Sequence, residues 1–97
     1  MSRFRYSEDA NRDIEEIALY LLDLNPTAAY RFLDSLEGVC ELLATHPQLG
    51  SSREELAEGL RSFPLGNYLV FYLLGTDGID VVRVIYGGRD LPKIFGQ

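Results

Sequence analysis

The stretch that decides the fold is residues 60–90, which read LRSFPLGNYLVFYLLGTDGIDVVRVIYGGRD. It contains three runs rich in aliphatic, β-branched and aromatic residues, at 60–63, 68–74 and 79–86. The two connections, 64–67 and 75–78, are rich in turn-forming residues. Short turns of this kind join neighbouring antiparallel strands, so the stretch predicts a three-stranded antiparallel meander.

Two amphipathic helices are predicted upstream of the meander. Ser7 is a good helix N-cap, and apolar residues recur at helical spacing behind it, which predicts a helix over residues 8–24. Asn25 followed by Pro26 caps and starts a second helix at once, and this helix ends before Pro47. Two helices with so short a connection form an antiparallel hairpin.

The remaining segments complete the expected fold. Residues 3–6 alternate arginine with aromatic residues, which is typical of a short strand with one exposed face. Residues 47–59 are expected to be mostly connection, and residues 89–95 a short helical or irregular tail. The sequence thus predicts an α+β protein with an N-terminal strand, a helical hairpin and a meander, in a single domain over residues 1–97.

Charge is unevenly distributed along the 97-residue chain. The net charge is −6, and residues 8–58 alone contribute −9, from twelve acidic residues and three arginines. Eight of the nine cations are arginine, the residue suited to forked contacts with carboxylate or phosphate. The negative balance argues against a protein that coats nucleic acid, so no direct sequence-specific nucleic-acid binding is expected.

The scarcity of soft ligands excludes several other classes. Cys40 is the single cysteine and His46 the single histidine, so an internal disulfide is excluded, and neither a metal site nor a cofactor is expected. Cys40 lies on the apolar stripe of the second helix, which favours a core position. No segment approaches the roughly 18 apolar residues that span a bilayer, so a cytoplasmic protein without membrane association is expected.

The meander predicts a specific arrangement of arginines. A turn at 75–78 that pairs the strand ends directly places Val70 opposite Arg83. A turn at 64–67 of the same kind places Arg61 opposite Val70. We therefore expect Arg61, Val70 and Arg83 to form one row across the sheet.

Strand alternation then assigns the other residues to two faces. The arginine face also carries Phe63, Tyr68, Tyr72 and Ile85. The opposite face is entirely apolar and is expected to pack against the helices; it carries Leu60, Leu69, Phe71, Leu73, Val82 and Val84. The arginine face would remain open, and because it is too apolar to be left bare, we expect a partner protein to cover it. The alternative is that its arginines bind the chain's own carboxylates, such as Glu55, Glu58 or Asp90.

The order of these elements and residues resembles the ParE branch of the RelE/ParE toxin superfamily, over essentially the whole chain. The matching residues are Ser7, Ala10, Asp13-Ile14-Glu15-Glu16-Ile17 and Tyr20, then Asn25-Pro26, Ala29 and Phe32, then Pro47 and Leu49-Gly50, then Leu60-Arg61-Ser62-Phe63, Tyr68-Leu69-Val70-Phe71-Tyr72, and Val82-Arg83-Val84-Ile85-Tyr86-Gly87-Gly88-Arg89-Asp90. The resemblance implies the toxin of a type II toxin–antitoxin pair, held in a hetero-oligomeric complex by a ParD-like antitoxin. ParE proteins are described as inhibitors of DNA gyrase, whereas RelE relatives cut mRNA in the ribosome.

The residues favour binding over cleavage. Cleavage of RNA needs a general base, a general acid and cationic stabilisation of the transition state. Arg61 and Arg83 stand where RelE-type enzymes also keep arginines, but the only lysine is the distant Lys93. Strand parity predicts that Tyr86 faces the core and leaves Tyr72 as the aromatic hydroxyl near the arginines.

Two main hypotheses and a third reading follow. As a binding toxin, the chain has no catalytic residue, and its antitoxin- and target-binding residues are Arg61, Phe63, Tyr68, Val70, Tyr72, Arg83, Arg89 and Lys93. As a RelE-like endoribonuclease, it would use Arg61, Arg83 and Tyr72. The third reading is a degenerate toxin that acts only with its antitoxin as a co-repressor.

Overall fold

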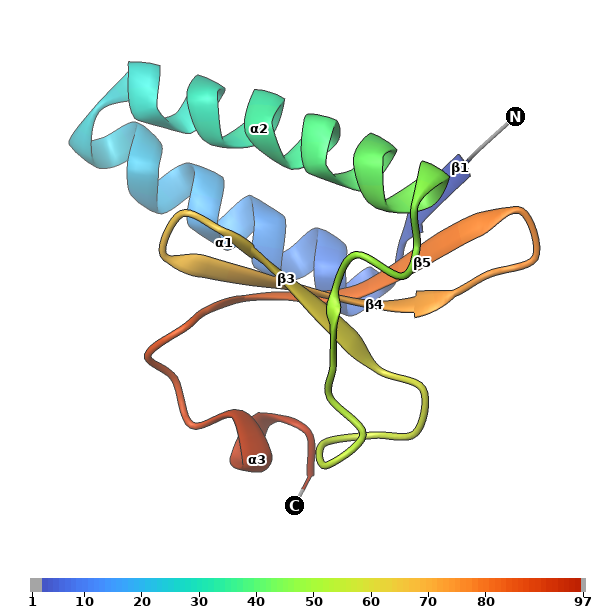
Figure 1. Cartoon of the computed structure of the whole chain (residues 1–97). Coiled ribbons are helices and arrows are strands. Elements are labelled where there is room, and N and C mark those ends of the chain that lie inside the picture. Colours follow the sequence, from blue (N-terminus) through green and yellow to red (C-terminus); the bar gives the residue numbers. More distant parts are fainter. Residues whose placement is uncertain (1–2, 97) are drawn as a thin grey trace.

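The computed structural model describes residues 3–96, which form two helices on one face of a five-stranded sheet and a short third helix on the other (Figure 1). The elements in chain order are β1 (Arg3–Tyr6), α1 (Glu8–Leu24), α2 (Pro26–Thr45), β2 (Ser51–Ser52), β3 (Arg61–Leu65), β4 (Tyr68–Leu74), β5 (Gly78–Tyr86) and α3 (Leu91–Ile94). The predicted α+β class is confirmed.

Local capping explains the bounds of the helical hairpin. The Ser7 side chain accepts a hydrogen bond from the Ala10 N–H at 3.0 Å, which satisfies a free donor in the first turn of α1. Asn25 is extended, and its side chain accepts from the Thr27 N–H at 3.0 Å, so one residue ends α1 and caps α2. The predicted bounds of both helices are confirmed.

The sheet has the order β1-β5-β4-β3-β2. The strands β3, β4 and β5 form the predicted antiparallel meander, and β1 pairs with β5 in parallel. The two-residue β2 adds an edge strand within the segment that was expected to be connection, since Ser51 and Ser52 pair with Ser62 and Arg61. The first and last strands of the chain are therefore neighbours.

The predicted bounds of the first meander strand are wrong by two residues at its end. The strand β3 continues to Leu65, which pairs with Tyr68 across a two-residue turn at Gly66 and Asn67. Gly66 has a φ of 59°, a conformation that glycine adopts without steric cost. Pro64 is tolerated inside β3 because β2 pairs only with the start of this strand, so no neighbour needs a donor there.

A β-bulge overturns the predicted arginine row. Tyr72 pairs with Val81, but Phe71, the residue before it in β4, pairs with Arg83, so β5 contains one extra residue at this point. Val70 consequently faces Val84 rather than Arg83. Arg61 lies opposite Tyr72, so Val70 does not connect the two arginines.

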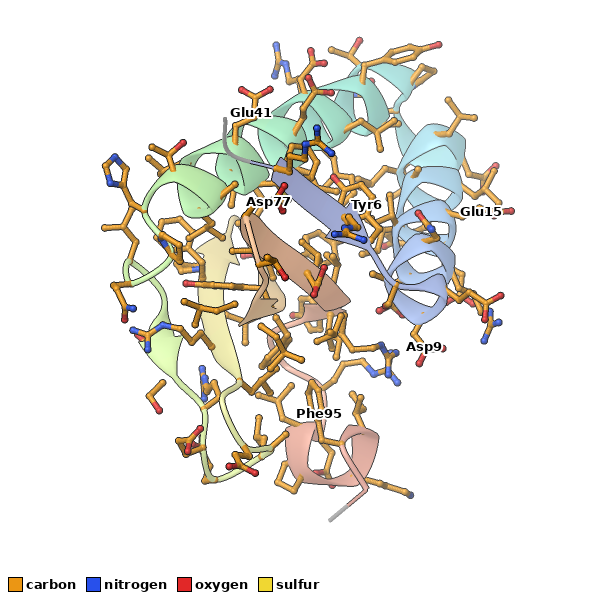
Figure 2. All side chains as sticks on the ribbon, turned by 90° about the vertical axis from the view of Figure 1, so that its right-hand side faces the viewer. Tyr6, Asp9, Glu15, Glu41, Asp77 and Phe95 are labelled. Atoms are coloured by element: carbon orange, nitrogen blue, oxygen red, sulfur yellow. The ribbon has the colours of Figure 1, made fainter. Side chains whose placement is uncertain are left out.

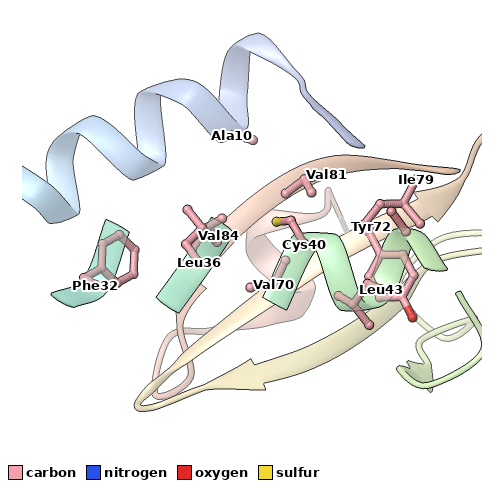
Figure 3. Close-up of a cluster of buried hydrophobic side chains, with 11 residues drawn as sticks. Ala10, Phe32, Leu36, Cys40, Leu43, Val70, Tyr72, Ile79, Val81 and Val84 are labelled. Atoms are coloured by element: carbon pink, nitrogen blue, oxygen red, sulfur yellow. The ribbon is translucent and has the colours of Figure 1, made fainter. Parts of the chain in front are cut away.

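The assignment of the sheet faces was also wrong. The helices cover the face that was predicted to be open, where Val70 and Tyr72 are fully buried (Figure 3). The buried residues of this main core are Ala10, Phe32, Leu36, Cys40, Leu43, Ala44, Val70, Tyr72, Ile79, Val81 and Val84. Both faces are apolar, so alternation alone cannot tell which one the helices cover.

A second, smaller core fills the opposite face. It consists of Leu56, Leu60, Phe71 and Ile85, against which the chain packs Leu69, Leu73, Val82, Leu91, Ile94 and Phe95. The ring centroids of Phe71 and Phe95 are 4.9 Å apart, so the C-terminal segment covers the middle of the sheet. This covering segment leaves the sheet without a broad open face within residues 3–96.

Two further expectations concern single residues. Cys40 is fully buried, as predicted. Tyr86 was expected to face the core, but it lies at the end of β5 beyond the bulge and is 53% exposed. In the described part of the chain, no helix is both long and apolar enough to cross a membrane.

Candidate partner-binding site

Arg83 is held by a carboxylate of the helical hairpin. Its Nε donates to Asp13 Oδ2 at 2.7 Å and its Nη2 donates to Asp13 Oδ1 at 2.9 Å, which is the forked geometry that favours arginine over lysine. Asp13 Oδ2 also accepts the N–H of Val84 at 3.0 Å. Arg83 thus binds an internal carboxylate, but on α1 rather than at the positions that the sequence suggested.

The end of β1 explains why Asp13 is in position. Tyr6 pairs with Val81, and beyond this pair β5 has no strand on its outer side. Ser7 donates its hydroxyl to the Val82 carbonyl at 2.9 Å, and Asp13 accepts from Val84. Side chains of α1 and its cap therefore satisfy the backbone of β5 at the point where β1 has ended.

The hydrogen bonds that Arg83 donates to Asp13 are the main cause that raises its pKa, and the charges of Asp13, Asp9 and Glu16 raise it further. The side chains of Arg83 and Asp13 are 24% and 12% exposed. A guanidinium in this setting remains charged, and the edge formed by its Nε and Nη2 is fully hydrogen-bonded to Asp13. It can present only its remaining nitrogen to a ligand.

Arg61 is also used internally. Its Nη2 donates to the carbonyl oxygens of Gln48 at 3.0 Å and Gly50 at 2.5 Å, both in the segment that follows α2. Arg61 therefore anchors the connection between α2 and β2 to the sheet. Within residues 3–96, its buried Nε has no hydrogen-bond partner.

Tyr72 occupies the same region but is fully buried. Its hydroxyl donates to the Pro47 carbonyl at 2.7 Å and accepts the Gly50 N–H at 2.9 Å. A hydroxyl with both functions engaged by backbone groups fixes the loop after α2 and has no free position for acid–base chemistry.

The other residues predicted for the site divide into two groups. Phe63, Tyr68 and Val70 pack in the main core, although Tyr68 keeps some exposure and its ring lies 6.2 Å from that of Tyr86. Arg89 and Lys93 are exposed and line one shallow depression around α3. The structure thus brings Arg89 and Lys93 together but not with Arg61 or Arg83.

The largest set of exposed apolar side chains lies on the helical hairpin, which sequence reasoning missed. We define the hairpin surface as the side chains on α1 and α2 that are apolar or aromatic and at least 39% exposed: Leu19, Tyr20, Leu22, Leu24, Tyr30, Leu33 and Leu42. A helix that packs on one side keeps its apolar residues in one stripe. In the sequence, the signal for this hairpin surface was the set of leucines that lie outside the apolar stripe of each helix.

The fold is shared with a solved toxin–antitoxin structure. A chain of the chromosomal ParDE TA system from P. aeruginosa aligns with a TM-score of 0.73 at 17% identity, covering 89% of this chain and 96% of that chain. At this identity the likeness establishes the fold alone. The chain therefore has the α+β fold that occurs in that ParDE system.

Sequence relatives establish the family. Residues 4–91 match the ParE toxin of the type II toxin–antitoxin system parDE. Toxin ParE1 of Caulobacter vibrioides is 29% identical over 97 residues, which is 99% of this chain and 100% of the relative. Toxin RelE3 of the same organism is 30% identical over 76 residues, which is 77% of this chain and 83% of the relative. The chain belongs to the ParE family of type II toxins.

Proposed function

We propose that this ParE-family toxin is neutralised by a ParD-like antitoxin and that it arrests growth in the cytoplasm by binding DNA gyrase. The observation that carries the proposal is the hairpin surface, seven exposed leucine and tyrosine side chains on the two helices. Aromatic side chains are enriched where proteins bind one another, and Tyr20 and Tyr30 are 61% and 67% exposed. The family assignment supports a ParD-like protein as the occupant.

The positions of the polar groups support binding rather than cleavage. Arg83 is bound to Asp13, Arg61 to two carbonyls, and the Tyr72 hydroxyl to two backbone groups. The exposed cations Arg89 and Lys93 can instead contact a carboxylate on the target or the antitoxin. No group in this set has to change partner for the toxin to bind a protein.

A second candidate function is cleavage of mRNA in the ribosome, which the similarity to Toxin RelE3 favours. It would require Arg61, Arg83 and Tyr72 to reach an RNA phosphate. The forked contact to Asp13 would first have to open, and Tyr72 would have to leave the core. These costs make cleavage the less favoured function.

Induced expression in a bacterial host tests whether the chain is a toxin. We expect growth arrest on induction, and recovery when the neighbouring short reading frame is co-expressed. Normal growth without the antitoxin overturns the proposal. Normal growth together with tight co-purification of the antitoxin supports the co-repressor reading instead.

Purified components separate the two targets. We expect the chain to inhibit DNA supercoiling by gyrase, with DNA-damage signalling in arrested cells and no codon-specific cuts on primer extension. Such cuts with unaffected gyrase would establish the nuclease instead.

Variants of the hairpin surface test the antitoxin site. The double substitution Leu22→Glu with Tyr30→Glu adds charge to two exposed apolar positions, so co-purification with the antitoxin should fall at least tenfold. The control, Asp23→Ala with Asp34→Ala, changes two exposed acidic residues of the same helices and should leave the complex intact. Equal loss in both variants would contradict the assignment of this surface.

A further inference from the structure

A pocket with a volume of about 500 Å³ lies beside the second, smaller core. The start of α1, the segment before β3 and the C-terminal segment all contribute to it. Its apolar walls are formed by Leu60, Leu73, Val82, Ile94 and Phe95. A volume of this size accommodates a long side chain or a small ligand. We call this space the C-terminal pocket.

Three charged side chains also line the C-terminal pocket, and they are Asp9, Glu58 and Arg83. Figure 2 shows Asp9 at the start of α1 and Phe95 next to α3, at the same end of the molecule. Asp13 balances the charge of Arg83 through its forked contact. The charges left over at the pocket are therefore the two carboxylates, Asp9 and Glu58.

Neither of these carboxylates has a strong partner. Asp9 Oδ1 lies 3.6 Å from Nη1 of Arg12, but the two side chains are 64% and 69% exposed, and an exposed pair of this kind contributes little. Within residues 3–96, Glu58 forms no ion pair. The pocket therefore carries a negative charge, which attracts a cation and repels a phosphate or a carboxylate.

The group that fits the C-terminal pocket has an apolar stem and a compact cationic head. A lysine side chain has this form, because its methylene stem can lie along apolar walls while its ammonium stays near carboxylates. Asp9 and Glu58 come from different segments, so they are two separate acceptors rather than one forked partner. Separate acceptors suit the rotatable donors of an ammonium better than the planar fork of a guanidinium.

The lysine has to be carried on a larger molecule. A free alkylamine has too few atoms to bind more tightly than in the millimolar range. On a protein surface, the contacts around the lysine hold it at the pocket and raise its effective concentration. A second copy of this chain is a poor source, since it has only Lys93 and two copies with a net charge of −6 repel each other.

We propose that the C-terminal pocket receives a lysine side chain of the toxin's protein target, with its ammonium near Asp9 and Glu58. This inference rests on the proposed function and names the chemistry by which the target is recognised. The hairpin surface, proposed above for the antitoxin, consists of side chains between positions 19 and 42, none of which lines the pocket. The target and the antitoxin therefore contact different side chains.

A titration with capped amino acids tests the pocket in the purified full chain. The probe is lysine acetylated at its α-amino group and amidated at its carboxyl group. Its controls are the same derivatives of norleucine, which has the stem without the ammonium, and of glutamate. In an ¹⁵N–¹H spectrum, the amides of Leu73, Val82 and Phe95 should shift with the lysine probe and at least fivefold less with either control. Equal shifts with norleucine, or larger shifts with glutamate, would overturn the proposal.

Neutral substitutions provide the matched variants. Asp9→Asn with Glu58→Gln should weaken the lysine probe at least fivefold and weaken inhibition of gyrase supercoiling, while co-purification with the antitoxin stays unchanged. Glu8→Gln with Glu55→Gln makes the same change in net charge on the same two segments, at exposed positions that do not line the pocket. This control should alter each reading less than twofold. Equal losses in the two variants would contradict the pocket.

The source of the lysine is identified by footprinting gyrase with an acetylating reagent. We expect at least one gyrase lysine to be protected in the complex with the wild-type chain. The same lysine should react in the complex with Asp9→Asn and Glu58→Gln at equal occupancy. Shifts of the pocket amides that grow with the concentration of the chain alone, and disappear in Lys93→Met, would identify a second copy as the occupant and reject the target.

These experiments keep the inference separate from the proposed function. Inhibition of supercoiling without any protected lysine contradicts the pocket and leaves the proposed function standing. A wild-type chain that binds the lysine probe without inhibiting gyrase contradicts the proposed target and leaves the ligand class of the pocket standing.

Discussion

Asp13 in α1 binds Arg83 in β5 through both carboxylate oxygens, at 2.7 and 2.9 Å, although seventy positions separate them in the chain. The same carboxylate accepts the Val84 N–H, one residue past the bulge that re-aims Arg83. The bulge and the ion pair therefore form one unit, which fixes α1 against the sheet and turns a potential ligand-binding arginine into a structural one.

Removal of the Asp13 charge should destabilise the fold. We expect Asp13→Asn to lower the free energy of unfolding by about 2–3 kcal/mol, because it leaves Arg83 without its carboxylate in a half-buried position. Urea unfolding measures this effect. Asp23→Asn, the same substitution at an exposed position of α1, should change stability by less than about 0.5 kcal/mol. Similar values for the two variants would contradict the role given to Asp13.

The Tyr72 hydroxyl should contribute to stability and not to toxicity. Tyr72→Phe leaves the Pro47 carbonyl and the Gly50 N–H without partners, which should cost about 1–3 kcal/mol. Tyr86→Phe, at an exposed position, should cost almost nothing. Growth arrest at a temperature where both variants are folded should match the wild type. A folded Tyr72→Phe variant without toxicity would support the nuclease.

Gly78 is required where β1 lies beside the start of β5. A Cβ at this position would overlap the backbone of Arg3, so Gly78→Ala should displace β1 and destabilise the fold by about 2 kcal/mol or more. Gly38, in α2, has open space around its Cβ position, so Gly38→Ala should stabilise by up to about 1 kcal/mol. Hydrogen exchange at Arg5 and Ser7 reports on β1 directly. Retained protection in Gly78→Ala would refute this packing.

Cys40 should make the fold sensitive to alkali. Burial raises the pKa of its thiol from 9.0 to about 11, so the folded state holds a proton that the unfolded state loses first. This contribution to stability is complete below about pH 9 and is lost as the pH rises towards 11. Between pH 8 and 10.5, the wild type should lose about 1–2 kcal/mol more than Cys40→Ala. Equal losses in urea unfolding would contradict the burial effect.

The helices and the meander could be predicted from the sequence because their signals are local. Ser7 and Asn25 cap the helices through bonds to residues two or three positions away, and Gly66 permits the turn that it occupies. The positions of the predicted site residues depended instead on the register between neighbouring strands. One extra residue at the bulge moved Arg83 away from Val70, and no local pattern around Val82 announces it.

The sequence by itself determined the class of fold, the element order and the burial of Cys40, since spacing and capping act over a few residues. Only the tertiary structure decided which face of the sheet the helices cover, because both faces are apolar and alternation along the strands is the same for either choice. The packing of α1 against β5 also brought Asp13 to Arg83 as its partner. The acceptors nearest in space set the role of each arginine, a carboxylate for Arg83 and two backbone carbonyls for Arg61, and a linear pattern does not contain them.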